Sequence, residues 1–315
     1  MIEYNKAQLS LVAQENGFMR DTFEKVLRLK EVLKFINLND YLSQHLVLKG
    51  GIAINMTIFD LPRLSVDIDL DYIPNDTLEK MQDARNNITG IIKEYMKGEG
   101  YILLPSSRYS FSLDALYFQY FNGGGNKDIL KIEINYSLRA HIFEPVERVV
   151  LSNIFEEQLK VLVLNPMEIF AAKTNALMSR AASRDLYDFN NMEYYGLFDE
   201  SEKVIFRKCI IFYNTISQKT INMEFDTSAI DQLTFNKIRR DLFPVLKRKD
   251  NFDLETRKTK AKKYIEDLMN LTDEEKEYMI AFENKQYKPE LLFTDREIVE
   301  RVKVHPMAIW KCKND

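Results

Sequence analysis

The sequence contains little cysteine, histidine, glycine or proline. The chain of 315 residues has 2 Cys, 3 His, 10 Gly and 8 Pro. Cys209 and Cys312 lie far apart, which excludes a disulfide framework and a CxxC zinc pattern. The histidines (His45, His141 and His305) are too scattered to supply a zinc hydrolase with ligands. The low glycine and proline content excludes collagen-like and low-complexity proteins.

Long apolar runs are also missing. No stretch approaches the roughly 20 residues that a membrane span needs, and the N-terminus shows no basic-then-apolar export signal. We therefore expect a cytoplasmic protein without a membrane partner. Apolar residues make up 45% of the chain and charged residues 29%, as in ordinary globular proteins. The formal net charge of −4 is too close to balance to favour or exclude a nucleic-acid partner.

The order of predicted elements divides the chain near residue 160. Residues up to about 42 have helical periodicity, and a short apolar strand then ends in Lys49-Gly50-Gly51. Beyond Asn165-Pro166, a good N-cap followed by a residue suited to the first helical position, the pattern is almost entirely helical. We expect domains at 1–160 and 161–315. Between these landmarks the sequence predicts strands at 66–72, 115–121, 129–136 and 161–164, and a helix at 76–98.

The segment 66–72 alternates strictly between apolar and other side chains, so that Asp67, Asp69 and Asp71 share one face of a strand. Like charges on one face repel, and a bridging cation makes them tolerable. Asp67 and Asp69 project side by side, which suits Mg²⁺, an ion that takes a few carboxylates together with substrate phosphate oxygens. Glu133, on a later strand, is a candidate third carboxylate. The alternative is the solvated face of an edge strand.

Two further features are candidates for phosphate binding. A strand that runs into Gly50-Gly51 and then a helix is a common way to present backbone N–H groups to phosphate, although a glycine pair usually marks only a turn. On the helix predicted from Pro166, Lys173, Arg180 and Arg184 lie within about 20° of one line at 3.6 residues per turn. This basic stripe either faces a cleft or is a solvated helix edge.

The order strand, Gly-Gly, helix, Asp-x-Asp strand and acid-bearing strand is that of the nucleotidyltransferase superfamily. In detail, Leu48 to Asn55 and Arg63 to Leu70 closely resemble the AbiEii/AbiGii nucleotidyltransferase toxins of abortive-infection and type IV toxin–antitoxin systems. The resemblance covers about residues 45–190. It continues at Asn165-Pro166-Met167-Glu168, Ala172-Lys173, Arg180 and Arg184-Asp185-Leu186-Tyr187-Asp188, and weakly at 305–311.

The resemblance implies an α+β fold: a polymerase-beta-like mixed sheet with flanking helices, and a mainly helical C-terminal lobe that contributes Lys173 and Asp188 to the cleft. It implies Mg²⁺-dependent transfer of a nucleoside monophosphate from a nucleoside triphosphate, GTP or CTP, to an acceptor hydroxyl. The implied acceptor is RNA, at the 3′ end of tRNA. The implied outcome is growth arrest, neutralised by a cognate antitoxin encoded nearby.

The resemblance also implies roles for individual residues. Asp67 and Asp69 would hold Mg²⁺, and Glu133 would complete the metal site or help activate the acceptor hydroxyl. Lys173 would neutralise phosphate charge, and Asp188 would orient Lys173 or contact the nucleotide. The wider superfamily has Gly-Ser where this chain has Gly50-Gly51, so Ser65 is the substitute hydroxyl. The implied nucleotide-binding residues are Gly50, Gly51, Ser65, Lys173 and Arg180.

A basic stretch supports an RNA acceptor. Between residues 237 and 263 there are eleven Lys and Arg against four Asp and Glu, a bias that could track a polynucleotide backbone or only a solvated helix surface. Two other hypotheses stay open: transfer to a protein or a small molecule, and a nucleotide- or RNA-binding module without turnover. Elsewhere, Cys209 is expected to be a buried thiol and Trp310 a packing anchor.

Overall fold

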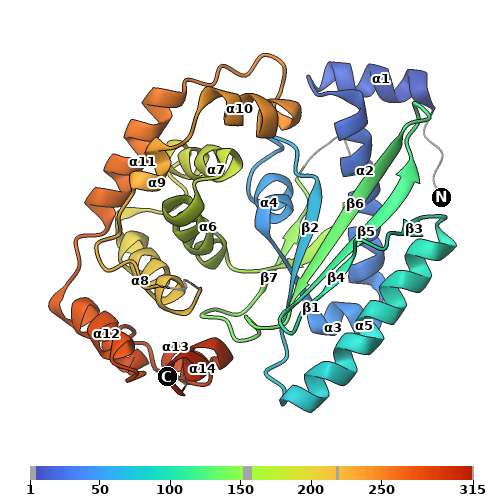
Figure 1. Cartoon of the computed structure of the whole chain (residues 1–315). Coiled ribbons are helices and arrows are strands. Elements are labelled where there is room, and N and C mark those ends of the chain that lie inside the picture. Colours follow the sequence, from blue (N-terminus) through green and yellow to red (C-terminus); the bar gives the residue numbers. More distant parts are fainter. Residues whose placement is uncertain (1–4, 152–157, 218–219, 314–315) are drawn as a thin grey trace. The chain divides into compact units, whose positions relative to one another are not determined.

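The computed structural model describes residues 5–151, 158–217 and 220–313, and the chain forms two compact units (Figure 1). The first unit comprises Met1–Arg139, Pro145–Leu164 and Phe243–Asp250. The second comprises Ala140–Glu144, Asn165–Leu242 and Asn251–Asp315. Each unit therefore contains segments that are distant in the sequence. None of the helices in the described part of the chain combines the length and apolar character needed to cross a membrane.

The first unit is built on a mixed sheet with the order β3-β5-β6-β2-β1-β8-β7, and β4 pairs with β5. Strand β2 runs antiparallel to β1 and parallel to β6. This mixed sheet with flanking helices confirms the predicted α+β class. The strands are β1 (Leu46–Lys49), β2 (Asp67–Tyr72), β3 (Ile102–Leu103), β4 (Arg108–Tyr109), β5 (Leu113–Phe121), β6 (Lys127–Asn135), β7 (Val146–Val149) and β8 (Lys160–Val163).

The two faces of the sheet differ along β5 and β6. Even-numbered residues such as Leu116, Ile132 and Ile134 are fully buried, whereas most odd-numbered residues stay half-exposed or exposed. Helix α2 runs behind these two strands in Figure 1 and buries an apolar stripe that includes Phe23 and Leu33. The helices of this unit are α1 (Lys6–Glu15), α2 (Arg20–Leu38), α3 (Asp40–His45), α4 (Gly50–Ala53), the π-helix η1 (Ile54–Ile58), α5 (Leu78–Gly98) and the 3-10 helix η2 (Phe243–Val245).

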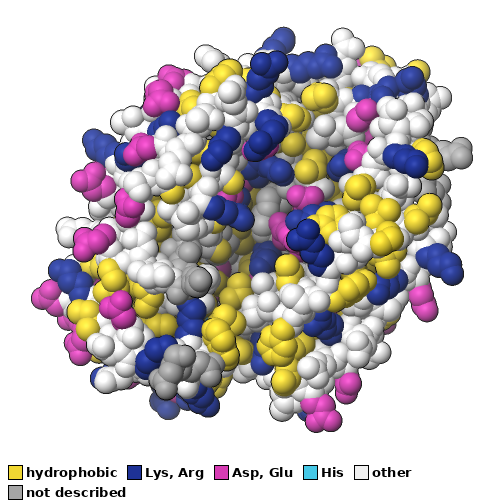
Figure 2. All heavy atoms as spheres, viewed as in Figure 1, with side chains coloured by type: hydrophobic (Ala, Val, Ile, Leu, Met, Phe, Trp, Pro, Cys, Tyr) yellow, Lys and Arg dark blue, Asp and Glu magenta, His cyan; other side chains and the backbone are white. Residues whose placement is uncertain are grey.

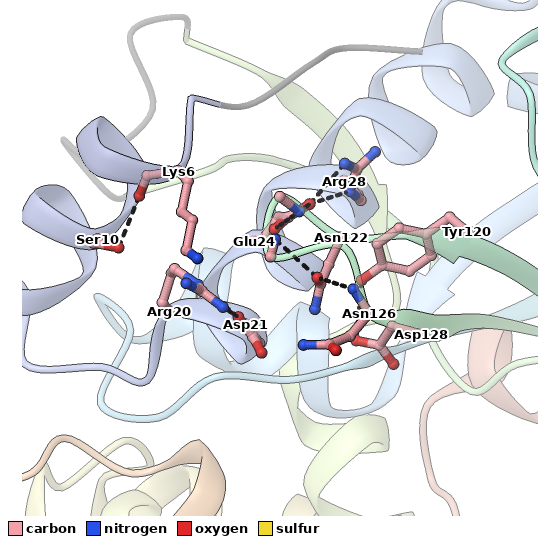
Figure 3. Close-up of polar contacts among 12 residues, drawn as sticks. Lys6, Ser10, Arg20, Asp21, Glu24, Arg28, Tyr120, Asn122, Asn126 and Asp128 are labelled. Atoms are coloured by element: carbon pink, nitrogen blue, oxygen red, sulfur yellow. Dashed lines mark hydrogen bonds and ion pairs between the residues drawn. The ribbon is translucent and has the colours of Figure 1, made fainter.

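Helix α2 fixes the β5–β6 hairpin through a buried carboxylate (Figure 3). Glu24 accepts a hydrogen bond from the Gly123 N–H at 2.8 Å and pairs with Arg28 at 2.6 Å. The Arg28 guanidinium in turn lies over the Tyr120 ring, 4.6 Å from its centroid. Within the turn, the Asn122 side chain accepts from the N–H groups of residues 124 and 126. The hairpin predicted at 122–126 is therefore held both by Glu24 of α2 and by hydrogen bonds within its own turn.

The second unit contains helices and no strands among its described residues, as predicted for the C-terminal lobe. Helix α6 begins as expected, because the Asn165 side chain accepts from the Met167 N–H at 3.0 Å and Pro166 occupies the first turn. The helices are α6 (Pro166–Arg180), α7 (Ser183–Tyr194), α8 (Glu200–Ser217), α9 (Ser228–Asp231), α10 (Phe235–Asp241), α11 (Leu254–Leu268), α12 (Asp273–Glu283), the 3-10 helix η3 (Pro289–Leu291), α13 (Arg296–Val302) and α14 (Pro306–Lys313).

Two expectations for this unit are wrong. The basic stripe was expected on one helix, but α6 ends at Arg180 because Ala181 adopts the left-handed conformation at φ +44°, so Arg184 lies on α7. Trp310 was expected to be a packing anchor, yet 58% of it is exposed. The prediction for Cys209 is confirmed, because its thiol is fully buried.

Candidate active site

The predicted acidic residues lie in two neighbouring rows of the sheet in the first unit. Strand pairing places Asp69 opposite Lys49 on β1 and opposite Glu133 on β6. Asp67 lies opposite Lys131 in the neighbouring row. Because residues that face each other across paired strands project to the same side, these carboxylates and ammonium groups share one face of the sheet. Strand pairing thus places Glu133 next to Asp69 of the Asp-x-Asp strand.

The charges in these rows are partly paired. The Lys49 ammonium lies 2.5 Å from Asp71 Oδ1, and Lys131 lies 2.8 Å from Glu133 Oε2. Burial, opposed by Lys49 and reinforced by the nearby acids Glu133 and Asp67, raises the pKa of Asp69 to about 6. A carboxylate in this position is therefore costly to ionise, and an added cation would stabilise the ionised form.

The donor set of this face suits a hard divalent cation. Asp67 and Asp69 are half-buried carboxylates, the ligand type that Mg²⁺ combines with substrate phosphates. Across residues 5–151, 158–217 and 220–313, no group of three or more His, Cys, Asp and Glu side chains is arranged to hold a metal ion. Two protein carboxylates completed by phosphate oxygens is the coordination that these residues fit.

The glycine pair lies directly against these acids. Gly50 has φ +71°, and a Cβ at this position would lie 2.2 Å from Asp69 Oδ2. A Cβ on Gly51 would lie 2.5 Å from the hydroxyl oxygen of Ser65, which is itself buried. The glycines therefore let the start of α4 approach the Asp69 carboxylate and the Ser65 hydroxyl. Only glycine combines that approach with the left-handed backbone at residue 50.

We expect Gly50→Ala to destabilise the first unit by about 1–3 kcal/mol, because it adds a left-handed penalty and a clash with Asp69. The matched control is Gly90→Ala. Gly90 lies inside α5, and a Cβ added there would meet no atom within 4 Å. This control should stabilise the protein by about 0.5–1 kcal/mol. Thermal and urea unfolding of the two variants test this, and equal effects would contradict the close packing at Gly50.

In the second unit, Lys173 bridges two acids of α7. Its ammonium lies 2.9 Å from Asp185 Oδ1 and 2.9 Å from Asp188 Oδ2, and all three side chains are nearly buried. Arg180 approaches Asp185 Oδ2 at 3.5 Å but is 70% exposed. The predicted pairing of Asp188 with Lys173 is therefore present. Asp185 thus contacts both Lys173 and Arg180.

Glu168, part of the stretch that carried the family resemblance, has an anchoring position. This buried carboxylate accepts from the N–H groups of Ile142 and Phe143 at 2.8 and 3.1 Å and from the Tyr213 hydroxyl at 2.7 Å. Burial raises the pKa of Glu168 despite the opposing effect of His141. Glu168 thereby holds the segment Ala140–Glu144 within the second unit.

The basic stretch at 237–263 is distributed over separate elements. Lys247, Arg248 and Lys249 belong to the first unit, and the other cations lie on α10 and α11. Lys258 is buried and pairs with Glu255 at 3.1 Å, so it is a structural residue. Over α11 and α12, basic and acidic side chains are interspersed (Figure 2). The cations that stay exposed include Lys237, Arg239, Lys260 and Lys263.

The structure thus divides the predicted site residues into two groups. Gly50, Gly51, Ser65, Asp67, Asp69 and Glu133 belong to the first unit, and Lys173, Arg180 and Asp188 belong to the second. The sequence interpretation missed Lys49, which the antiparallel register places beside Asp69. Its position at the end of an apolar strand, directly before the glycine pair, was the available signal.

Comparisons with known proteins address the family and the fold of the chain. The family model described as nucleotidyl transferase AbiEii toxin, type IV TA system, matches residues 37–283. No curated protein matches the sequence. Among solved structures, the nucleotidyltransferase toxin MenT4 from Mycobacterium tuberculosis H37Rv is similar at 13% identity and a TM-score of 0.63. That alignment covers 98% of this chain and 99% of MenT4.

Proposed function

Because this chain belongs to the AbiEii nucleotidyltransferase toxins of type IV toxin–antitoxin systems, we propose that it uses Mg²⁺ to transfer a nucleoside monophosphate to RNA. The donor is a nucleoside triphosphate, and the acceptor is a hydroxyl at an RNA 3′ end. The observation that carries the proposal is the row Lys49–Asp69–Glu133 with Asp67 beside it and Gly50 packed against Asp69.

The proposed reaction is attack by an acceptor oxygen on the α-phosphorus, which breaks the bond to the bridging oxygen and releases pyrophosphate. Asp67 and Asp69 would hold Mg²⁺, which supplies charge neutralisation at the phosphates. Glu133, which pairs with Lys131 and lies next to Asp69, would receive the proton of the acceptor hydroxyl. Gly50, Gly51 and Ser65 would bind phosphate oxygens through backbone N–H groups and a hydroxyl.

In this proposal the second unit supplies positively charged side chains. We assign Lys173 to neutralising phosphate charge, with Asp188 as the residue that orients its ammonium group, because their ion pair is present at 2.9 Å. Arg180 is the exposed cation of the same helix and is assigned to the nucleotide. The exposed cations of α10 and α11 support an RNA acceptor, because they suit a phosphate backbone. As a type IV toxin, the protein is expected to be neutralised by a cognate antitoxin encoded nearby.

The test is to incubate the purified protein with Mg²⁺, total cellular RNA and each labelled nucleoside triphosphate in turn. We expect label in an RNA band of tRNA size with one nucleotide, GTP or CTP. Asp67→Asn should abolish the transfer and the toxicity without unfolding the protein, because it removes a metal ligand and leaves the volume unchanged. The matched control is Asp83→Asn, an exposed aspartate on α5, which should transfer normally.

Each alternative has its own result. Label in a protein band or in a small molecule would show that the acceptor is not RNA, while the proposed nucleotidyl transfer would stand. An Asp67→Asn/Asp69→Asn variant that remained fully toxic would end the enzymatic proposal in favour of a binding module.

A further inference from the structure

The exposed face of β5 and β6 continues beyond the acids as a strip of aromatic and apolar side chains. Tyr117 lies opposite Lys131, which lies opposite Asp67. In the next row, Gln119 pairs with Ile129 on one side and Ile102 on the other. In the last row Phe121 pairs with Lys127. All of these residues occupy the face that carries Asp67 and Asp69, because strand partners and every second residue project to one side.

These side chains are not needed for the core of the first unit. Phe121 is 55% exposed, Ile102 and Ile129 are also exposed, and Tyr117 is half-buried. On this side of the molecule, hydrophobic side chains gather over β5 and β6, with basic side chains beside them (Figure 2). A contiguous exposed apolar strip in a protein of this composition marks a binding surface.

Its charge pattern points to nucleic acid. Protein interface cores are depleted in charged residues, whereas each aromatic residue of this strip has a lysine as its direct strand neighbour. Lys131 pairs with Glu133, but Lys127 and Arg108 are exposed, and neither forms an ion pair with any described residue. Arg108 lies opposite Ala115 in the row of Asp69 and Glu133. Aromatic rings that stack bases, interleaved with cations that meet phosphates, are the equipment for binding single strands.

The spacing and rigidity of the strip fit this use. Tyr117 and Phe121 are four residues apart on one strand, about 13 Å at about 3.3 Å per residue, so that two bases can stack without competing. Sheet surfaces in RNA-binding domains stack two or three bases in this way. The Glu24–Arg28 pair behind the sheet holds the hairpin in place, with Tyr120 pointing to Arg28 and away from the exposed face (Figure 3). The platform is therefore preorganised.

We propose that Tyr117 and Phe121 stack unpaired bases of a single-stranded RNA acceptor on the exposed face of β5 and β6, directing its terminal hydroxyl toward Asp67 and Asp69. This inference rests on the proposed function for its direction, and it adds the residues that recognise an unpaired end. Lys127 and Arg108 would contact the phosphates. A duplex end would not be bound in this way, because its bases are already stacked on each other.

The test measures binding without turnover. Fluorescence anisotropy of a labelled oligo(A) or oligo(C) RNA, without nucleotide, should show at least about a tenfold loss of affinity for Tyr117→Ala/Phe121→Ala, since each stacked base contributes about 1–3 kcal/mol. Phe121→Trp should keep the affinity. The matched control is Tyr109→Ala, because Tyr109 is 51% exposed on β4 and lies opposite the buried Asp114, on the other face. This control should change the affinity for the single-stranded RNA less than about twofold. The affinity for a blunt RNA duplex should likewise change less than about twofold in every variant.

Three results would overturn the platform. Unchanged single-strand affinity in the double variant is the first, and an equal loss in Tyr109→Ala is the second. The third is a shift in oligomeric state caused by the double variant while RNA affinity stays the same, which would identify the strip as a contact between copies of this chain. These results are distinct from failure of the proposed function, which would appear as no label transfer by the wild-type protein whatever the binding affinity.

Discussion

Lys173→Met is expected to destabilise the second unit by about 3–5 kcal/mol, the cost of leaving buried carboxylates without their counter-ion. Its ammonium lies 2.9 Å from an oxygen of both Asp185 and Asp188, which are almost completely buried. The matched control is Arg180→Met, because Arg180 approaches the same Asp185 but is mostly exposed. An exposed pair contributes at most about 1 kcal/mol. Urea unfolding of the two variants measures the difference.

A second series separates the structural role of Lys173 from a role in transfer. Lys173→Met/Asp185→Asn/Asp188→Asn removes the stranded charges and should recover most of the lost stability. If Lys173 also neutralises phosphate, this variant is folded but inactive in the label-transfer assay. Equal losses of stability in Lys173→Met and Arg180→Met would show that the buried pairs do not hold α6 against α7.

Asp69→Asn is expected to raise stability at neutral pH in metal-free buffer while it lowers transfer by at least about 100-fold. Replacing residues that only support metal ligands already costs about 10–100-fold. Burial raises the pKa of Asp69 to about 6, whereas an aspartate in the unfolded chain has its usual pKa near 4. Between these two pH values the folded protein therefore keeps a proton on Asp69 that the unfolded chain has released. The free energy of unfolding therefore falls as pH rises from about 4 to 6. For this half-buried group we expect a gain of about 1–2 kcal/mol at pH near 7 on removing the charge.

The pH dependence provides the internal control for this prediction. At about pH 3 or below Asp69 is mostly protonated in both the folded and the unfolded state, so Asp69→Asn and the wild-type protein should unfold at nearly the same temperature. The exposed control Asp83→Asn should show no difference at either pH. A lower melting temperature for Asp69→Asn at neutral pH would mean that Lys49 and Lys131 more than offset the burial and the repulsion from Glu133 and Asp67.

Much of the first unit could be predicted from the sequence, because its signals are local. The strict alternation of 66–72 and the apolar run before Gly50 depend only on the period of a strand and on turn chemistry. The structure has β2 at Asp67–Tyr72, β1 ending at Lys49 and α4 beginning at Gly50. The glycine pair was interpreted as a phosphate-binding turn. The structure adds that the missing Cβ atoms leave room for the side chains of Asp69 and Ser65.

The prediction failed where a long-range contact overrode a local pattern. Nothing in the composition of 176–184 ends a helix, but Ala181 adopts φ +44° and turns the chain so that Asp185 and Asp188 reach back to Lys173. Lys258 was grouped with the cations of its stretch, whereas its side chain is buried and pairs with the exposed Glu255. Charge counts along a sequence carry no information on which cations are already paired.

By itself, the sequence determined the strands that correspond to β1, β2, β5, β6 and β8, the face that carries Asp67 and Asp69, and the family, because these depend on residue periodicity and on motifs that are contiguous in the chain. The tertiary structure alone decided which charges neighbour them. Lys49 and Glu133 flank Asp69 only through the register of β1, β2 and β6, and Tyr117 and Phe121 share that face only through the β5–β6 pairing. The physical reason is that electrostatic energy depends on distance in space, and strand register brings together residues that are far apart in the chain.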